Sequence, residues 1–118
     1  MALCMFSNNY HMFDITPVEN LFIQEFMLKA PGDFVKVYLY GLKQCYCKDC
    51  AENSIESFAR ALDMEQEAVR NAFYYWERQG ILKTSEGEDG KFSVEYYNIK
   101  DILYNRDISN EKVLYKYR

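Results

Sequence analysis

The sequence has no excess of positive charge and no long hydrophobic run. Its formal net charge is −4 and its pI is about 5.0, so the chain as a whole lacks the basic signature of nucleic-acid binding. No apolar run approaches the ~20 residues that cross a bilayer. The opening stretch, MALCMFSNNYHMF, has neither a basic start nor a long apolar segment, which argues against a signal peptide. We expect a soluble cytoplasmic protein without a membrane partner.

Patterns for catalysis are also missing. His11 is the only histidine, and no orienting group or nearby cysteine marks it, so we interpret it as a surface or edge residue. The acids form no pair suited to general acid–base work. The five glycines are spread among turns and one helix, which excludes a glycine-rich phosphate loop. We expect no enzymatic activity, no cofactor and no small-molecule substrate.

Three of the four cysteines fall within six residues: Cys45, Cys47 and Cys50. They could hold zinc with Cys4 or His11 as the fourth ligand, but there is no second close pair. Cys45 also falls on the core face of a predicted helix. We favour Cys45 as a small buried hydrophobe and the other two as loop thiols, since a cytosolic chain keeps its cysteines reduced.

Apolar and aromatic residues are abundant. The chain of 118 residues is 49% hydrophobic, enough for one domain with its own core. Aromatic residues make up 17%, including eleven tyrosines. Tyrosine suits half-buried surfaces and interfaces, because its ring packs while its hydroxyl stays in water.

The clearest helical pattern runs from Glu65 to Gln79. Its apolar residues fall at i, i+3, i+4 and i+7: Val69, Ala72, Phe73 and Trp76. Gly80 follows as the helix stop. A second helix over Ser54–Leu62 repeats the same spacing, and only Asp63 and Met64 separate the two, which indicates a helix-turn-helix. Asn53 or Ser54 caps the second helix, and Asn53 with Glu56 is the better capping box.

A β-hairpin follows. Ile81–Ser85 reads as a strand, and 87–90 is the strongest turn signal, since Asp-Gly favours tight hairpins. The return strand alternates, with its half-buried residues at Phe92, Val94 and Tyr96.

Upstream, 10–16 reads as extended. A short helix then starts either at a capping box on Thr16, with Pro17 at its first position, or at Asn20, and ends before Pro31. A longer helix starts at Asp33 and frays near Cys47. Its core face is Phe34, Val37, Tyr38, Gly41, Leu42 and Cys45, and a second face is Val35, Leu39 and Tyr46. Gly41 is interpreted as allowing another helix to approach closely.

The fold class expected is mainly α with a small β-hairpin. We expect a winged helix-turn-helix with an N-terminal strand and helix and a C-terminal helix as extensions. The C-terminal helix starts near Asn98 and buries Ile99, Ile102 and Leu103. Residues 1–104 form the domain, and 105–118 form a tail or the start of a linker.

Three blocks, Val18–Ile23, Val35–Tyr40 and Tyr75–Leu82, together resemble the N-terminal domain of DnaD-like primosomal proteins, over roughly residues 10–104. The resemblance implies an extended winged helix that self-associates and contacts the bacterial replication initiator. It also implies that DNA binding belongs mainly to a second, C-terminal domain, which is absent from this sequence. Two features depart from the family: Glu65 stands where a threonine is common, and the cysteine cluster is unusual.

The expected partner of this winged helix is protein rather than DNA. From 65 to 91 there are six acids and four bases, and the turn Glu86–Asp89 would point acids at phosphates. The helix flank instead offers Tyr74, Tyr75 and Arg78, types enriched at interfaces. The alternative is that the two tyrosines only cover the wing and the final helix.

For self-association we expect the hairpin, with Glu88 and Phe92, and the N-terminal segment, with Tyr10 and Phe13, because an extended segment can add to a sheet edge. The leading hypothesis is therefore a non-enzymatic oligomerisation and docking domain of bacterial replication initiation and primosome assembly. The alternative is a winged-helix transcription regulator that binds DNA.

Overall fold

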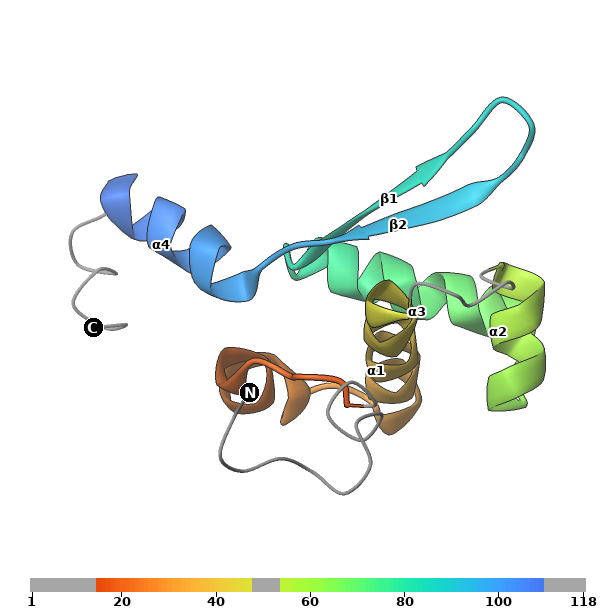
Figure 1. The fold of residues 1–118 in the computed structure, drawn as a ribbon, viewed down its shortest axis with the longest axis horizontal. Coiled ribbons are helices and arrows are strands. Elements are labelled where there is room, and N and C mark those ends of the chain that lie inside the picture. The colour runs from red at the N-terminus through yellow and green to blue at the C-terminus, as the bar shows by residue number, and fades with distance from the viewer. Residues whose placement is uncertain (1–14, 48–53, 110–118) are drawn as a thin grey trace, which may run out of the picture.

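The computed structural model describes residues 15–47 and 54–109, with side chains up to residue 104. Within these ranges the chain is mainly helical and has one two-stranded antiparallel sheet (Figure 1). The elements in order are η2 (Phe22–Met27), α1 (Gly32–Tyr46), α2 (Ile55–Leu62), α3 (Gln66–Arg78), β1 (Leu82–Glu86), β2 (Phe92–Tyr96) and α4 (Ile99–Ser109). The mainly helical class with a small hairpin is confirmed.

Helix α3 lies at the centre of the core. Val69, Ala72 and Trp76 are each 0% exposed, as the helical spacing predicted. The Trp76 indole Nε1 donates a hydrogen bond of 2.7 Å to the Phe34 carbonyl of α1. A buried indole N–H needs such an acceptor, so this bond fixes α3 against α1.

Helix α2 packs on α3 and is joined to it by a short turn. Ser54 is its N-cap, and Ser54 and Ser57 each accept the other's backbone N–H. The preferred capping box of Asn53 with Glu56 is therefore wrong, and the Ser54 alternative is right. In the turn, Asp63 takes a left-handed conformation with φ 54°, which lets the chain reverse within three residues.

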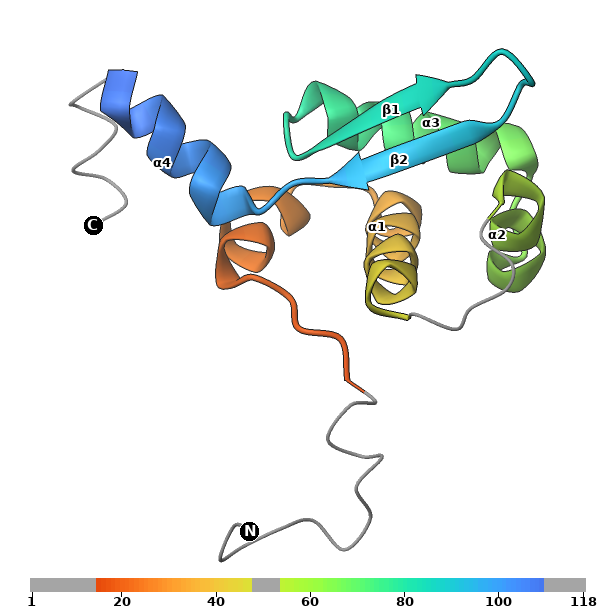
Figure 2. The same ribbon diagram turned by 45° about the horizontal axis from the view of Figure 1, so that its top comes forward.

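The hairpin projects from the end of α3 (Figures 1 and 2). Gly80 adopts φ 85° after the last turn of α3, so its role as helix stop is confirmed. Strand β1 begins at Leu82, one residue later than expected. Glu86 pairs with Phe92, which leaves 87–91 as a loop longer than a tight Asp-Gly turn. It is closed by a Gly87 N–H to Lys91 C=O bond of 2.9 Å.

Helix α1 buries most of the expected stripe, but its last turn differs. Its buried residues are Val37, Tyr38, Gly41 and Gln44, while Cys45 is exposed, so the prediction of a buried Cys45 is wrong. Tyr96 of β2 lies over Gly41, where an added Cβ would collide with its hydroxyl. Gly41 thus admits a strand side chain rather than a helix.

The second face expected on α1 is mostly in solvent. Leu39 is 36% exposed and Tyr46 is 55% exposed. Val35 alone packs partly against the core.

The N-terminal helix begins at Asn20, the second of the two proposed starts. Residues 15–19 are not helical, so the capping box on Thr16 is wrong. The helical turn begins at Asn20 and continues as π-helix through Met27. Phe22 stacks on Tyr38 with 4.1 Å between ring centroids, which anchors η2 to α1. The expected extended segment over 10–16 falls mostly outside the described residues.

Helix α4 leaves the body beside η2 (Figure 2). Ile99 is 0% and Leu103 4% exposed, as predicted, and Asn98 Oδ1 accepts the Asp101 N–H at 3.1 Å. The helix continues to Ser109, across the boundary expected after residue 104.

Candidate functional site

The candidate site is the outer face of α3 together with the hairpin. Tyr74 meets Phe92 of β2 edge to face, with 5.9 Å between ring centroids. The Arg70 guanidinium lies 5.9 Å from the Phe92 ring centroid, within reach of a cation–π attraction. The structure thus brings Tyr74 and Phe92 together and adds Arg70, which the sequence analysis did not single out.

Tyr75 lies on another side of α3. Its ring packs 5.1 Å from Phe34 and 4.8 Å from Trp76, between centroids. Adjacent residues on a helix point about 100° apart, which separates Tyr75 from Tyr74. Tyr74 therefore covers the hairpin, as the alternative interpretation expected, whereas Tyr75 covers α1 rather than the final helix.

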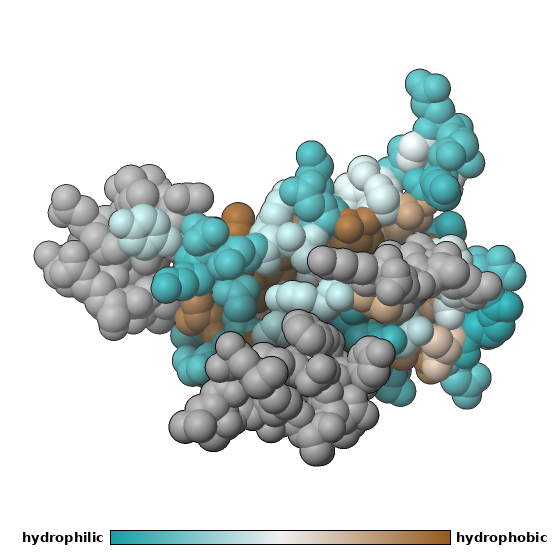
Figure 3. Space-filling view, in the orientation of Figure 1, coloured by the Kyte–Doolittle hydropathy of each residue, from teal (hydrophilic) through white to brown (hydrophobic). Residues whose placement is uncertain are grey.

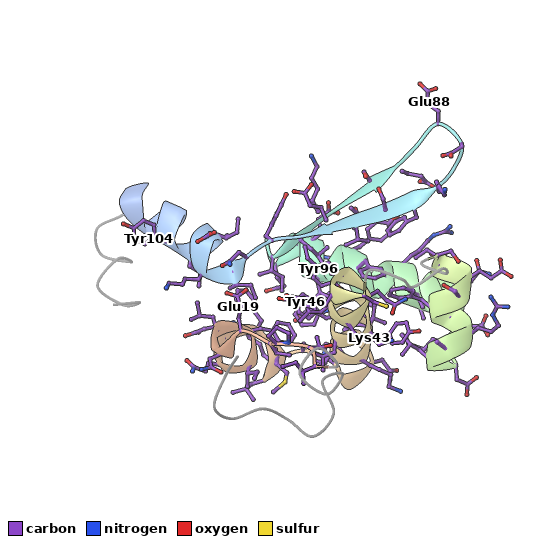
Figure 4. The ribbon with its side chains drawn as sticks, viewed as in Figure 1. Glu19, Lys43, Tyr46, Glu88, Tyr96 and Tyr104 are labelled. Carbon is purple, nitrogen blue, oxygen red and sulfur yellow. The ribbon has the colours of Figure 1, made fainter. Side chains whose placement is uncertain are left out.

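The remaining predicted residues are spread out. Arg78 is exposed at the end of α3, and Glu88 stands at the tip of the hairpin, away from the helices (Figure 4). Tyr10 and Phe13 lie outside the described residues.

The projecting end of the hairpin is hydrophilic (Figure 3), and most of its charged residues are acids. Glu86, Glu88 and Asp89 are all exposed there, with Lys91 the nearest base along the chain. A groove of about 820 Å³ separates this end from the first turns of α2 and α3. Arg70 lines the groove, and its Nε is buried without a hydrogen-bond partner among the described residues.

Glu77 of α3 holds the hairpin and was missed by sequence reasoning. Its carboxylate accepts the Thr84 hydroxyl at 2.7 Å and the Thr84 N–H at 2.9 Å. These two hydrogen bonds, the hydroxyl bond first, lower the pKa of Glu77. Only its position one turn before the helix stop could have hinted that it reaches the first strand.

Glu19 was also missed, because it had been assigned to the Thr16 capping box. Its carboxylate accepts the Ile99 N–H at 2.8 Å and the Lys100 N–H at 3.1 Å. These are free donors at the start of α4. Glu19 therefore caps a helix 80 residues away (Figure 4).

Tyrosine hydroxyls close the core behind α1. Tyr96 donates to the Tyr38 carbonyl at 2.9 Å. Burial raises the pKa of Tyr96 well above its usual value, and burial followed by the charge of Glu19 raises that of Tyr38. Neither phenol ionises near neutral pH, so their role here is packing and hydrogen bonding.

The described cysteines, Cys45 and Cys47, do not belong to a metal centre formed by the described residues. Cys45 is a free thiol, and packing around its sulfur raises its pKa. Cys47 is disulfide-bonded, so the expectation that it is a free thiol is wrong, and the disulfide removes it as a thiolate ligand. In the described ranges no group of three His, Cys, Asp or Glu side chains could hold a metal ion. Cys50, Cys4 and His11 lie outside those ranges.

Every helix within 15–47 and 54–109 is too short or too polar to cross a bilayer. Comparison of the chain with protein-family models, curated proteins and solved structures finds no match.

Proposed function

We propose that this chain is a non-enzymatic docking and self-association domain with a winged-helix architecture. Helix α2, the turn at 63–65 and α3 would form the helix-turn-helix, and the hairpin would form the wing. η2 and α4 would be its extensions. Support comes from the order of these elements and from the packing of α1, α2 and α3 on one another.

The observation that carries the proposal is the chemistry of the α3–hairpin face. Arg70, in the middle of α3, is packed over Phe92 instead of being held out. The hairpin tip offers Glu86, Glu88 and Asp89. Phosphate contacts need lysine and arginine at these places, whereas an aromatic cluster with an arginine is typical of a protein interface.

The resemblance to DnaD-like proteins supports a setting for this activity. We infer docking on the bacterial replication initiator and on other primosome components. DNA contact would be weak or would belong to a second domain.

Light scattering combined with a duplex-DNA titration at low salt tests the proposal. We expect oligomers that grow with protein concentration and no saturable DNA binding. A strict monomer that binds duplex DNA with steep salt dependence would refute it.

A second candidate function is DNA recognition by a transcription regulator. It is favoured by three exposed residues of α3, Gln66, Asn71 and Arg78, because amide and guanidinium groups read base edges in the major groove. The same DNA titration decides between the two functions.

A further inference from the structure

The two edges of the hairpin sheet differ in their hydrogen bonding. The Tyr97 N–H bonds to the Ile81 C=O at 3.2 Å, and the Gly87 N–H to the Lys91 C=O at 2.9 Å. In an antiparallel ladder such pairs alternate along the strands. With the observed register, Lys83, Ser85, Ser93 and Glu95 bond inward, so the residues between them direct their backbone groups outward.

The outward edge of β1 is occupied. The Thr84 N–H points away from β2 and donates to Glu77 Oε2 at 2.9 Å. This contact independently supports the alternation of inward and outward backbone groups along β1. It also places the Glu77 carboxylate where an added strand would have to form its hydrogen bonds. Strand addition at β1 is therefore blocked.

The outward edge of β2 is open. Its outward amides are those of Phe92, Val94 and Tyr96, and none of the described residues accepts a hydrogen bond from them. Beside this edge lies a cavity of about 160 Å³ lined by Val94, Gly41, Ile55 and Phe58, among others. An added strand would find unpaired backbone groups and an apolar recess beneath them.

The stretch from Lys91 to Glu95, which includes most of β2, is complementary to its own reverse in charge and equal to it in the pattern of polar and apolar residues. Around Ser93 it reads Lys-Phe-Ser-Val-Glu, from Lys91 to Glu95. When two such strands pair antiparallel about Ser93, Lys91 of each copy faces Glu95 of the other, and Phe92 faces Val94. Phe92 and Val94 both have outward backbone groups, so this register also satisfies the hydrogen-bond alternation, each pair exchanging two bonds.

We propose that β2 pairs with β2 of a second copy of this chain, antiparallel and centred on Ser93. The two hairpins then form one continuous four-stranded sheet with reciprocal Lys91–Glu95 pairs on its exposed face. This inference rests on the proposed self-association and assigns it to one strand edge.

Charge exchange tests the register. Lys91→Glu places two acids opposite each other at both ends of the pairing, and we expect it to raise the dimer dissociation constant by about tenfold. Glu95→Lys places two bases opposite each other at both ends of the pairing and should also raise the dimer dissociation constant by about tenfold. The double variant Lys91→Glu/Glu95→Lys restores both pairs and should return the constant to within about twofold of the wild type. If the losses of dimer affinity in the two single variants simply add in the double variant, this register is refuted.

Proline substitution tests the edge. The Val94 N–H points outward, so Val94→Pro removes no bond of the hairpin itself but blocks strand addition. We expect a folded monomer by circular dichroism and light scattering. Ser93→Pro is the matched control: it removes an inward ladder bond and should destabilise the hairpin instead.

Amide exchange at Phe92 and Val94 gives an independent readout. We expect protection that rises with protein concentration. Protection that is independent of concentration would mean that another part of the same chain covers the edge, and it would overturn the proposal. If Val94→Pro is folded and still oligomeric, the β2 edge is not the interface, although self-association stands. A wild-type protein that is monomeric at all concentrations overturns both.

Discussion

Glu77 shows how one side chain couples a helix to the strand that follows it. Its bonds to Thr84 lower its pKa. A carboxyl group whose pKa is depressed in the folded state stabilises that state above its unfolded pKa, and this stability is lost as the pH falls through the folded pKa. The contribution of Glu77 therefore belongs to neutral conditions and disappears in acid.

We expect Glu77→Gln to destabilise the protein at neutral pH by about 0.5–1 kcal/mol, because one of two charge-assisted bonds weakens and the other is lost. The difference from wild type should shrink as the pH drops through the range where Glu77 protonates. Urea denaturation at a series of pH values measures it. Glu67→Gln, an exposed acid on the same helix, is the control, and an equal effect there would contradict the assignment.

Cys45 and Cys47 should differ in alkylation. The raised pKa of Cys45 leaves less thiolate at neutral pH than an ordinary cysteine has, so its modification should be slow near pH 7 and accelerate at higher pH. Cys47 is disulfide-bonded and should react only after reduction. Tandem mass spectrometry of iodoacetamide-treated protein separates the two sites, and fast labelling of Cys47 in native, unreduced protein would contradict the structure.

Gly41 and Tyr96 determine how closely α1 and β2 approach. Gly41→Ala should cost about 1–3 kcal/mol of unfolding free energy, because the new methyl group meets the Tyr96 hydroxyl. Tyr96→Phe should itself cost about 1 kcal/mol by removing the bond to Tyr38. In the double variant the contact with the hydroxyl is gone, although the ring carbons Cζ and Cε1 of Tyr96 remain 3.0 and 3.3 Å from the new methyl group. The loss in the double variant should therefore be smaller than the sum of the two single losses. Strict additivity in thermal or chemical denaturation would argue against this contact.

Docking of α4 depends on an acid from the other end of the chain. Glu19→Ala removes two N-terminal bonds of α4 and a favourable charge at its positive end. We expect about 1 kcal/mol less protection of the α4 amides in hydrogen exchange, with α3 unchanged. Asn20→Ala, at an exposed neighbour, should have little effect, and equal losses in both variants would remove the assigned role.

The elements that sequence periodicity predicts well are those with a single buried stripe. The prediction of α3 is correct because Val69, Ala72 and Trp76 lie on one face of the helix, and this face is the one that packs in the core. The prediction for Cys45 failed because the spacing that fits Val37 and Gly41 does not decide which residue of the last turn of α1 faces inward, and there Gln44 is buried instead. Glu19 was missed because its partners are backbone N–H groups, which cannot be recognised from residue type. Glu77 was missed because its bonds to Thr84 depend on how the hairpin folds back along α3. In the candidate site the contact of Tyr74 with the hairpin was only the alternative prediction, and the separation of Tyr75 from Tyr74 was not predicted.

The molecule as a whole has two arms that extend from a three-helix body, the hairpin and α4 (Figure 1). The sign of charge on the hairpin arm is the property that most strongly separates protein docking from DNA binding. Changing that sign is therefore the most direct test at this level.

Glu86→Lys with Glu88→Lys should leave stability unchanged, since both residues are exposed at the tip. If the architecture is that of a winged helix, the variant should gain duplex affinity at low salt, with a salt slope near −2 from about two phosphate contacts. Fluorescence anisotropy measures it. The control is a variant with Glu25→Lys and Asp33→Lys, on η2 and at the start of α1. It changes the net charge by the same amount and should gain much less duplex affinity. If both variants gained the same duplex affinity, the hairpin would have no particular role in contacting DNA.

The carboxylate of Glu19 joins two parts of the chain that are 80 residues apart. A force applied to residues 15 and 109 is therefore transmitted through this clasp and the buried Ile99 before it reaches the three-helix body. Stretched in an optical trap, the molecule should release α4 in a first small step, and the body around Trp76 should yield only at a later and larger one.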